Sequence, residues 1–265
     1  MEKLLYEQRI KELEKELQNA VDSVSKYKKE QEEFVHIASH DLQAPLRKLS
    51  TFVERLTYKF KDVSGEEVKS YTERILATIT NMRSLIDDLS ALSEISGENH
   101  NFLKCDLNEL LQNVLKDIQP VISENNAVID CSALPVIEGN CAQLKLLFQN
   151  LITNSIKFKK KDTPLQIKVG SEQINQEGKK PFGLPAGKIY YKIEIMDSGI
   201  GFEDQYSEKI FQPFQRLHGK SDYEGNGLGL AICKKIMEKH HGIIYAKSSK
   251  NAGARFVLIL PEIYN

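Results

Sequence analysis

The sequence has 265 residues, of which 41% are hydrophobic and 28% are charged, so it has room for one large or two ordinary domains with a real core. Its formal net charge of −1 gives no electrostatic reason to expect a nucleic-acid partner or a membrane surface. No apolar run approaches the roughly 20 residues of a membrane-spanning helix, and the N-terminus does not resemble a signal peptide, so we expect a cytoplasmic protein without a membrane segment.

The four cysteines, Cys105, Cys131, Cys141 and Cys233, form no CxxC pair and show no metal-ligand spacing. Isolated cysteines in a reducing compartment remain thiols. We therefore expect buried, reduced thiols.

Residues 1–33 predict one long polar helix with a sparse apolar seam. The seam positions alternate three and four residues apart, which is the heptad spacing of a coiled coil. A lone helix this polar is marginal in water, so we expect it to pair with a copy of itself as a signalling coil. A stalk that only aids solubility is the alternative. The seam residues are Ile10, Leu13, Leu17, Ala20, Val24, Tyr27, Gln31 and Phe34.

Residues 34–95 predict a helical hairpin for dimerisation. The first helix is expected to end near Lys61, because Gly65 breaks the chain in the turn that follows. One hairpin cannot cover the apolar seams of both helices, so we expect two copies to form a dimeric four-helix bundle. The seams are Phe34, Ala38, Leu42, Leu46, Leu49, Val53 and Leu56 on the first helix and Val68, Tyr71, Ile75, Ile79, Met82, Ile86, Leu89 and Leu92 on the second.

Residues 96–101 predict a hinge between the hairpin and a second domain, residues 102–265. Helices and strands are segregated in the second domain, which favours an α+β fold with a two-layer α/β sandwich. The run 175–188 is rich in Gly and Pro and is expected to form a long hairpin loop without regular structure. We expect helices at residues 107–123 (capped by Asp106), 141–158 and 227–240, and strands at 127–131, 165–174, 188–196, 242–247 and 255–260.

One helical run, FVHIASHDLQAPLR at residues 34–47, carries a histidine beside a carboxylate. His40 lies two residues off the apolar seam, so its imidazole should face water or a partner. Asp41 can accept a hydrogen bond from one ring nitrogen and leave the other as a free lone pair, and Pro45 loosens the helix because it lacks an N–H. An exposed histidine without a function is one alternative. Half of a zinc site with His36 is another, although no further cysteine or histidine stands nearby.

The run NLITNSIKF, residues 150–158, places Asn150, Asn154 and Lys157 on one face of a predicted helix. Two amides and an ammonium at this spacing can converge on one ligand. An amide oxygen suits Mg²⁺, and a lysine supplies a point charge for phosphate. An amphipathic helix with polar outer residues is the alternative.

Two turns with glycines follow in the sequence. The first, DSGIGF, contains Asp197, Gly199 and Gly201 directly after a strand, and its glycines allow close approach of backbone to a ligand, although ordinary turns also contain Asp-x-Gly. The second, GNGLGL at residues 225–230, opens a helix, where N–H groups and the helix dipole favour phosphate. A dinucleotide fold is the rival, but no strand immediately precedes this turn. Its expected ligand contacts are Gly225, Gly227, Leu228 and Gly229.

Together these runs resemble the sequence boxes of sensor histidine kinases. The run around His40 is similar to their phosphoacceptor box, in the His-Asp-Leu-Gln-x-Pro-Leu-Arg form found in phytochrome-like kinases. The three later runs resemble the nucleotide-binding boxes that these kinases share with gyrase and mismatch-repair proteins. The four boxes stand in the family's order and span about residues 34–260. The resemblance implies ATP and Mg²⁺ as cofactors.

The resemblance also implies a role for each residue of the nucleotide boxes. Asn154 holds the magnesium that bridges the phosphates, Lys157 contacts phosphate and Phe158 borders the adenine. Asp197 accepts a hydrogen bond from the exocyclic amine of adenine, which selects adenine against guanine. Asn150 stands where ATP-hydrolysing relatives carry a glutamate, and its lack of basicity favours phosphate transfer over hydrolysis.

Two segments near these boxes have further implications. The run 211–224 resembles the mobile lid over bound ATP. Arg255 stands where the family often carries a hydroxyl near the adenine, so we expect an unusual ATP affinity.

The implied activity is ATP-dependent autophosphorylation of His40, assisted by Asp41, and transfer of the phosphate to an aspartate of a response-regulator receiver domain. The input domain of such a kinase is expected upstream or is absent. Ala44 stands where many members carry Thr or Asn to position a water, which predicts weak phosphatase activity. A non-catalytic dimeric signalling scaffold and a gyrase-type ATPase are the rival functions.

Overall fold

The computed structural model describes residues 13, 17–18, 24, 35, 42–43, 45–58, 66–96, 102–161, 163–217 and 226–263. The chain divides into two compact units, Met1–Gly97 and Glu98–Asn265. Most of the expected coiled coil, the turn at Gly65 and the residues His36, His40, Asp41, Ala44 and Gly225 lie outside the described residues. Among the residues that are described, none of the helices has the length and apolarity needed to cross a membrane.

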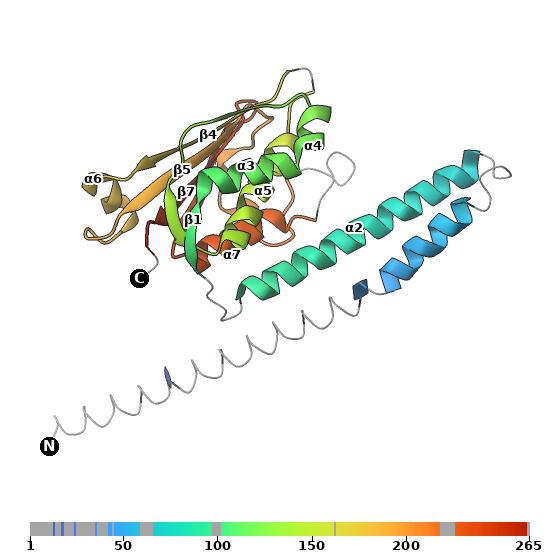
Figure 1. Ribbon diagram of the computed structural model, residues 1–265, viewed down its shortest axis with the longest axis horizontal. Coiled ribbons are helices and arrows are strands. Elements are labelled where there is room, and N and C mark those ends of the chain that lie inside the picture. Colours follow the sequence, from blue (N-terminus) through green and yellow to red (C-terminus); the bar gives the residue numbers. More distant parts are fainter. Residues whose placement is uncertain are drawn as a thin grey trace. The chain divides into compact units, whose positions relative to one another are not determined.

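The first unit contains two helices that lie side by side, residues 45–58 and α2, Glu66–Ser96 (Figure 1). Two residues from each helix form its core. Leu46 and Val53 pack with Ile79 and Ile86, and all four are 4–8% exposed. These contacts support the predicted pairing of the two helices.

A second set of apolar residues in this unit is exposed. Tyr71, Ile75 and Met82 of α2 are 57%, 46% and 48% exposed. Between residues 42 and 58, the exposed large apolar residues are Leu42, Leu49, Phe52, Leu56 and Tyr58. One chain therefore buries only part of the apolar seam that the sequence places on these helices.

The second unit is built on a five-stranded sheet in the order β2-β4-β5-β7-β6. β2 runs parallel to β4, and the other neighbours are antiparallel. Val169, Ile195 and Phe256 stand opposite one another on adjacent strands and are at most 2% exposed, so one face of the sheet is core. The strands are β2 (Val128–Cys131), β4 (Gln166–Gln173), β5 (Tyr190–Asp197), β6 (Ile243–Ser248) and β7 (Ala254–Pro261).

Three helices cover this apolar face: α3, Leu107–Asp117; α5, Cys141–Lys157; and α7, Gly229–Lys239 (Figure 1). Side chains alternate between the two faces of a strand, so residues between the buried positions of β5 face the other way. There Lys192 forms ion pairs with Glu172 and Glu194, each at 2.9 Å. The predicted α+β class and two-layer α/β sandwich are confirmed.

The single helix predicted for residues 107–123 is in fact two helices. α3 begins after Asp106, whose side chain accepts a hydrogen bond from Asn108 N at 2.8 Å, so the predicted cap is confirmed. α3 ends at Asp117, and α4, Gln119–Glu124, begins two residues later. Pro120 has no N–H to continue the helical hydrogen bonding, which explains the break.

A small two-stranded sheet was absent from the sequence prediction. β1, Leu103–Asp106, pairs antiparallel with β3, Val136–Gly139. Each strand has four residues, which is too short for alternation of apolar and polar residues to stand out. β3 leads directly into α5, so this sheet fixes where that helix begins.

The segment expected to be an irregular loop at 175–188 contains regular structure. It holds α6, Gln176–Lys179, and a 3₁₀ turn, Lys180–Phe182. Lys179 is only 6% exposed, and its Nζ donates to the carbonyl oxygens of Ala186 and Lys188 at 3.1 and 2.6 Å. These side-chain hydrogen bonds hold the segment together, which its Gly and Pro content did not predict.

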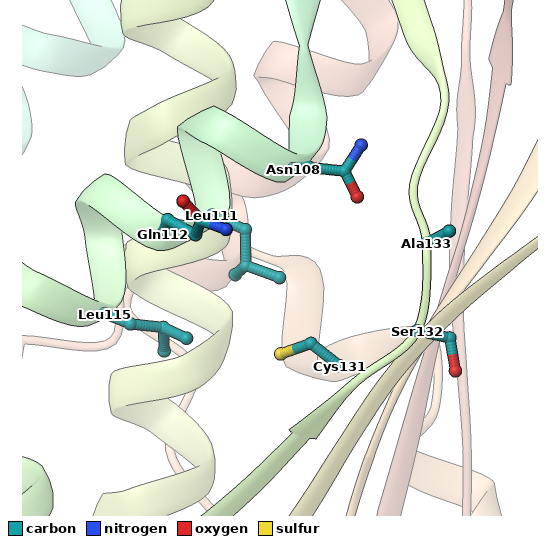
Figure 2. A pocket seen from close by; sticks show the side chains of 7 residues that line it. All are labelled: Asn108, Leu111, Gln112, Leu115, Cys131, Ser132 and Ala133. Atoms are coloured by element: carbon teal, nitrogen blue, oxygen red, sulfur yellow. The ribbon is translucent and has the colours of Figure 1, made fainter.

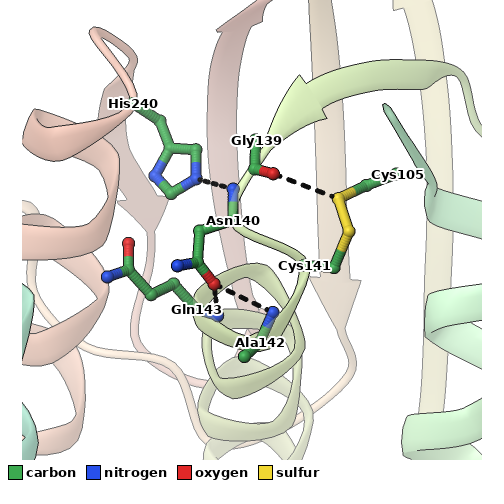
Figure 3. Close-up of a disulfide and its surroundings, with 7 residues drawn as sticks. All are labelled: Cys105, Gly139, Asn140, Cys141, Ala142, Gln143 and His240. Carbon is green, nitrogen blue, oxygen red and sulfur yellow. Dashed lines mark hydrogen bonds between the residues drawn. A yellow bond between two sulfur atoms is a disulfide. The ribbon is translucent and has the colours of Figure 1, made fainter. Parts of the chain in front are cut away.

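The expectation of four buried, reduced thiols is wrong. Cys105 of β1 forms a disulfide with Cys141 at the start of α5 (Figure 3). Cys131 is exposed, and only Cys233 is a buried free thiol. The pairing of β1 with β3 brings two cysteines together that are 36 residues apart, and cysteine spacing alone does not reveal such a contact.

Candidate functional site

Asp197 is the last residue of β5, and donors from three segments surround its carboxylate. Oδ1 accepts hydrogen bonds from Gly199 N at 2.8 Å and from Ala254 N at 3.1 Å. Oδ2 accepts one from Ser155 Oγ at 3.2 Å. Burial raises the pKa of Asp197, and the three hydrogen bonds together with the charge of Lys160 act in the opposite direction. The result is a partly desolvated carboxylate held in one orientation.

The backbone of Phe158 joins the turn after Asp197 to the end of α5. Its carbonyl oxygen accepts a hydrogen bond from Ile200 N at 2.9 Å. A Cβ added at Gly199 would lie 2.5 Å from the same oxygen, so only glycine allows this close approach. Gly201, two residues further on, completes the turn. The structure therefore brings Phe158 together with the turn that contains Asp197, Gly199 and Gly201.

Asn150, Asn154 and Lys157 all lie on α5, but they do not all have the same surroundings. Asn150 faces the start of α7, because its side-chain Oδ1 lies 3.6 Å from a Cβ built at Gly229. Its Nδ2 is buried and has no hydrogen-bond partner among the described residues. Lys157 Nζ lies 4.7 Å from the centre of the Phe158 ring. The helix thus places one amide against α7 and the lysine beside Phe158.

The second glycine turn is hydrogen-bonded to the first part of the predicted lid, residues 211–224. Phe214 N donates to Gly227 O at 3.0 Å, and Gly227 has a φ of 73°, which favours glycine. Leu228 is 1% exposed and accepts a hydrogen bond from Ile232 N at the start of α7. Gly225, the remaining predicted residue of this turn, lies outside the described residues.

These residues fit a purine nucleotide with magnesium. The second lone pair of Asp197 Oδ2 is available for an amine donor, and the orphaned Asn150 Nδ2 is available for an acceptor. The described part of the chain has no cluster of three or more His, Cys, Asp or Glu residues that would form a complete metal cage. Magnesium bound through phosphates needs only one or two protein oxygens, and an amide oxygen such as that of Asn154 is a ligand of that kind.

Sequence reasoning missed two contacts to Asp197, those of Ser155 and Ala254. Ser155 follows Leu144, Phe148 and Leu151 on the buried seam of α5, and a hydroxyl in an apolar seam was the signal that could have identified it. The contact of Ala254 is through backbone N–H and depends on the antiparallel pairing of β5 with β7. Side-chain patterns carry no information about it.

Arg255 does not reach this carboxylate. Its guanidinium lies 3.7 Å from Glu194 Oε1, and its side chain is 49% exposed. Glu194 belongs to the charged face of the sheet, and the helices pack on the other face. The unusual ATP affinity that we expected from Arg255 stays a prediction, and its neighbour Ala254 makes the contact to the site.

A surface pocket between α3 and the end of β2 lies apart from the predicted residues. Figure 2 shows Cys131 directed toward Leu111 and Leu115 in this pocket. Its volume of about 160 Å³ is below the roughly 300–1,000 Å³ of pockets that enclose small molecules. The other lining residues are Asn108, Gln112, Ser132 and Ala133, and none of them belongs to the nucleotide boxes.

Comparison with known proteins assigns both units. Residues 30–98 match the His Kinase A (phospho-acceptor) domain, and residues 139–263 match the histidine kinase-, DNA gyrase B-, and HSP90-like ATPase family. Cyanobacterial phytochrome A of Nostoc sp. is 33% identical over 246 residues, which are 93% of this chain and 30% of the phytochrome. The chain therefore spans less than a third of the length of that relative.

Two solved structures share the fold. The full-length ShkA structure in complex with AMPPNP has a TM-score of 0.65 and 20% identity over 86% of this chain and 45% of ShkA. The histidine kinase ThkA, in complex with the response regulator protein TrrA, has a TM-score of 0.57 and 18% identity over 89% of this chain and 64% of that one. With the acceptor domain and the ATPase domain in this order, the chain belongs to the sensor histidine kinases and forms their catalytic core.

Proposed function

We propose that this chain is an ATP-dependent protein-histidine kinase of two-component signal transduction, which phosphorylates its own His40 and passes the phosphate to an aspartate of a response-regulator receiver domain. In this proposal the hairpin, residues 34–95, carries the acceptor, and residues 102–265 bind ATP. Residues 96–101 are the hinge between them. The arrangement around Asp197 is the observation that supports it most strongly.

Asp197 recognises the adenine in this proposal. Backbone N–H groups of Gly199 and Ala254 hold Oδ1, which leaves Oδ2 to accept a hydrogen bond from the exocyclic amine of adenine. Guanine carries a carbonyl at that position, and two acceptors would then face each other. Phe158 lies against the same turn and borders the base.

The phosphates are held from α5 and from the start of α7. Asn154 would hold Mg²⁺ through its amide oxygen, and the ion would offset the charge of the phosphates there. Lys157 adds a positive charge, and the N–H groups at Gly227 to Gly229 meet phosphate oxygens at a helix N-terminus. Asn150 cannot act as a base toward water, which favours transfer to histidine over hydrolysis.

His40 is the nucleophile of the transfer. The lone pair of one neutral ring nitrogen attacks the γ-phosphorus, the P–N bond forms, and the bond from phosphorus to the ADP oxygen breaks. Asp41 accepts a hydrogen bond from the N–H of the other ring nitrogen and stabilises the positive charge that develops on the ring. Phosphohistidine then transfers its phosphoryl group to the aspartate of the regulator.

A second copy of the chain and a receiver domain are the proposed partners. Tyr71, Ile75 and Met82 are exposed apolar residues on the helices of the acceptor unit, and a homodimer would bury such a surface in a four-helix bundle. ThkA is a structural neighbour whose crystal structure contains a response regulator, which supports the same kind of partner here.

Incubation with γ-labelled ATP and Mg²⁺ tests the proposal. Wild type should acquire label that is stable in base and lost in acid, as expected for phosphohistidine. α-Labelled ATP should leave no label on the protein. A wild-type protein that hydrolyses ATP without becoming labelled would support the ATPase function instead.

A further inference from the structure

We infer that Ser155 is a positioning residue for adenine recognition, which holds Asp197 Oδ2 in place so that this oxygen accepts the amine of adenine. The inference rests on the proposed function, because it assumes that the residues around Asp197 bind ATP. It adds a specificity determinant on α5 to a site whose other contacts to Asp197 are backbone N–H groups.

Ser155 is a buried polar residue with two acceptors in reach. It is 1% exposed, and its Oγ lies 3.2 Å from Asp197 Oδ2 and 3.1 Å from Leu151 O. A serine hydroxyl has one proton, so it donates to one of these oxygens at a time. Its hydrogen is therefore used inside the protein in either orientation.

The two oxygens of Asp197 are held in different ways. Gly199 N and Ala254 N both donate to Oδ1, so the turn after β5 and the start of β7 fix that oxygen through backbone. The contact to Oδ2 comes from a side chain, the Ser155 hydroxyl. A carboxylate oxygen has two lone pairs, so Oδ2 keeps one for a ligand while Ser155 uses the other.

This arrangement has a consequence for base selection. While Asp197 is ionised and the Ser155 proton is directed to Asp197 or Leu151, neither side chain has a hydrogen to offer to the 6-carbonyl of a guanine. An amine at the same position finds an acceptor. The pair thus selects adenine because it offers no hydrogen-bond donor to the guanine carbonyl. A buried carbonyl that faces only acceptors stays unpaired, and this weakens the binding of guanine nucleotides.

The charge state of Asp197 supports the same role. Burial raises the pKa of Asp197, and the hydrogen bond from Ser155 lowers it, together with those from Gly199 and Ala254 and the charge of Lys160. Removing the hydroxyl shifts the balance toward the protonated acid. A protonated Oδ2 would donate, and the preference for an amine would weaken.

The chain offers a matched control on the same helix. Thr153 Oγ1 donates to Gln149 O at 2.7 Å, the same hydrogen bond to a residue four positions earlier that Ser155 makes to Leu151. Thr153 has no contact with Asp197 among the hydrogen bonds of the described residues. Thr153→Ala therefore removes a helix hydroxyl without touching the carboxylate.

The test compares two nucleotides by calorimetric titration of the whole protein with Mg²⁺: ATP, and purine riboside 5′-triphosphate, which lacks the 6-amine. Ser155→Ala should weaken ATP binding about tenfold and leave the affinity for the purine analogue unchanged. Ser155→Thr, which keeps the hydroxyl, should bind ATP like wild type. Thr153→Ala should not change the ratio of the two affinities.

Three outcomes would overturn the inference. Equal losses for both nucleotides in Ser155→Ala would show a general packing effect, and no loss for either would show that the hydroxyl is dispensable. A further tenfold loss of ATP affinity when Ser155→Ala is added to Asp197→Asn would show that Ser155 does not act through Asp197. A wild-type protein that binds neither nucleotide contradicts the proposed function itself, which is a different result.

Discussion

Asn140 N donates a hydrogen bond to His240 Nε2 at 3.0 Å, which joins the N-cap of α5 to the C-cap of α7 (Figure 3). The other ring nitrogen, Nδ1, lies 2.8 Å from Ile236 O and donates to it, because Nε2 is occupied as an acceptor. The His240 ring also stacks on Phe102 with centroids 4.7 Å apart. One neutral histidine therefore connects α5 and α7, the two helices at which two of the three nucleotide boxes lie.

This histidine predicts a pH dependence of stability. Burial, and the nearby charges of His241 and Lys239, lower the pKa of His240 below its ordinary value of 6.5. The unfolded chain therefore takes up a proton at a higher pH than the native state does. The contribution of His240 is complete above about pH 6.5 and declines as the pH falls toward the native pKa, by at most about 1.4 kcal/mol per pH unit.

Urea unfolding of wild type and His240→Gln at pH 7.5 and 5.5 measures this dependence. Glutamine does not titrate, so the stability difference between the two proteins should shrink at the lower pH. A difference that is the same at both pH values would show that His240 does not titrate differently in the two states.

The disulfide predicts a dependence of stability on reductant. Cys105 and Cys141 close a loop with a sequence separation of 36, and loop-closure entropy for this length corresponds to roughly 3–4 kcal/mol. A reductant should lower the free energy of unfolding of wild type by about that amount. Cys105→Ser should be insensitive to reductant, whereas Cys131→Ser, at an exposed free cysteine, should respond as wild type does.

The exposed apolar residues of α2 predict the dimer interface. Ile75→Lys combined with Met82→Lys should give a monomer in sedimentation, because both side chains are about half exposed in one chain and would be buried between two. Ser70→Lys at another exposed position of α2 is the matched control and should stay dimeric. ATP affinity should equal that of wild type in both variants, since the nucleotide residues belong to the other unit.

Ala44 predicts weak phosphatase activity toward a phosphorylated regulator. Its side chain has neither a donor nor an acceptor to position an attacking water. Unphosphorylated wild type with ADP should barely shorten the half-life of phospho-regulator, whereas Ala44→Thr should shorten it several-fold. Strong acceleration by wild type would contradict the prediction that Ala44 makes the phosphatase activity weak.

The sequence predicted the helices and central strands of the second unit because these elements are long and have clear apolar periods. It failed where structure depends on contacts between distant residues. Cys105 meets Cys141 only through the pairing of β1 with β3, and Lys179 orders its loop through carbonyl oxygens that no side-chain pattern reveals. In the candidate site, motif residues such as Asp197 were foreseeable, and the backbone contact of Ala254 was not.

Phosphate is expected on His40, and the nucleotide is expected at the site around Asp197. Both expectations are tested by measuring ATP affinity and γ-label incorporation on the same preparations of three variants. His40→Gln should bind ATP like wild type and take up no label, and His36→Ala should match wild type in both. Asp197→Asn should bind ATP roughly ten- to a hundredfold more weakly. It should therefore incorporate less γ-label than wild type when the ATP concentration is limiting. Label that persists on His40→Gln, or unchanged ATP affinity in Asp197→Asn, would contradict the account.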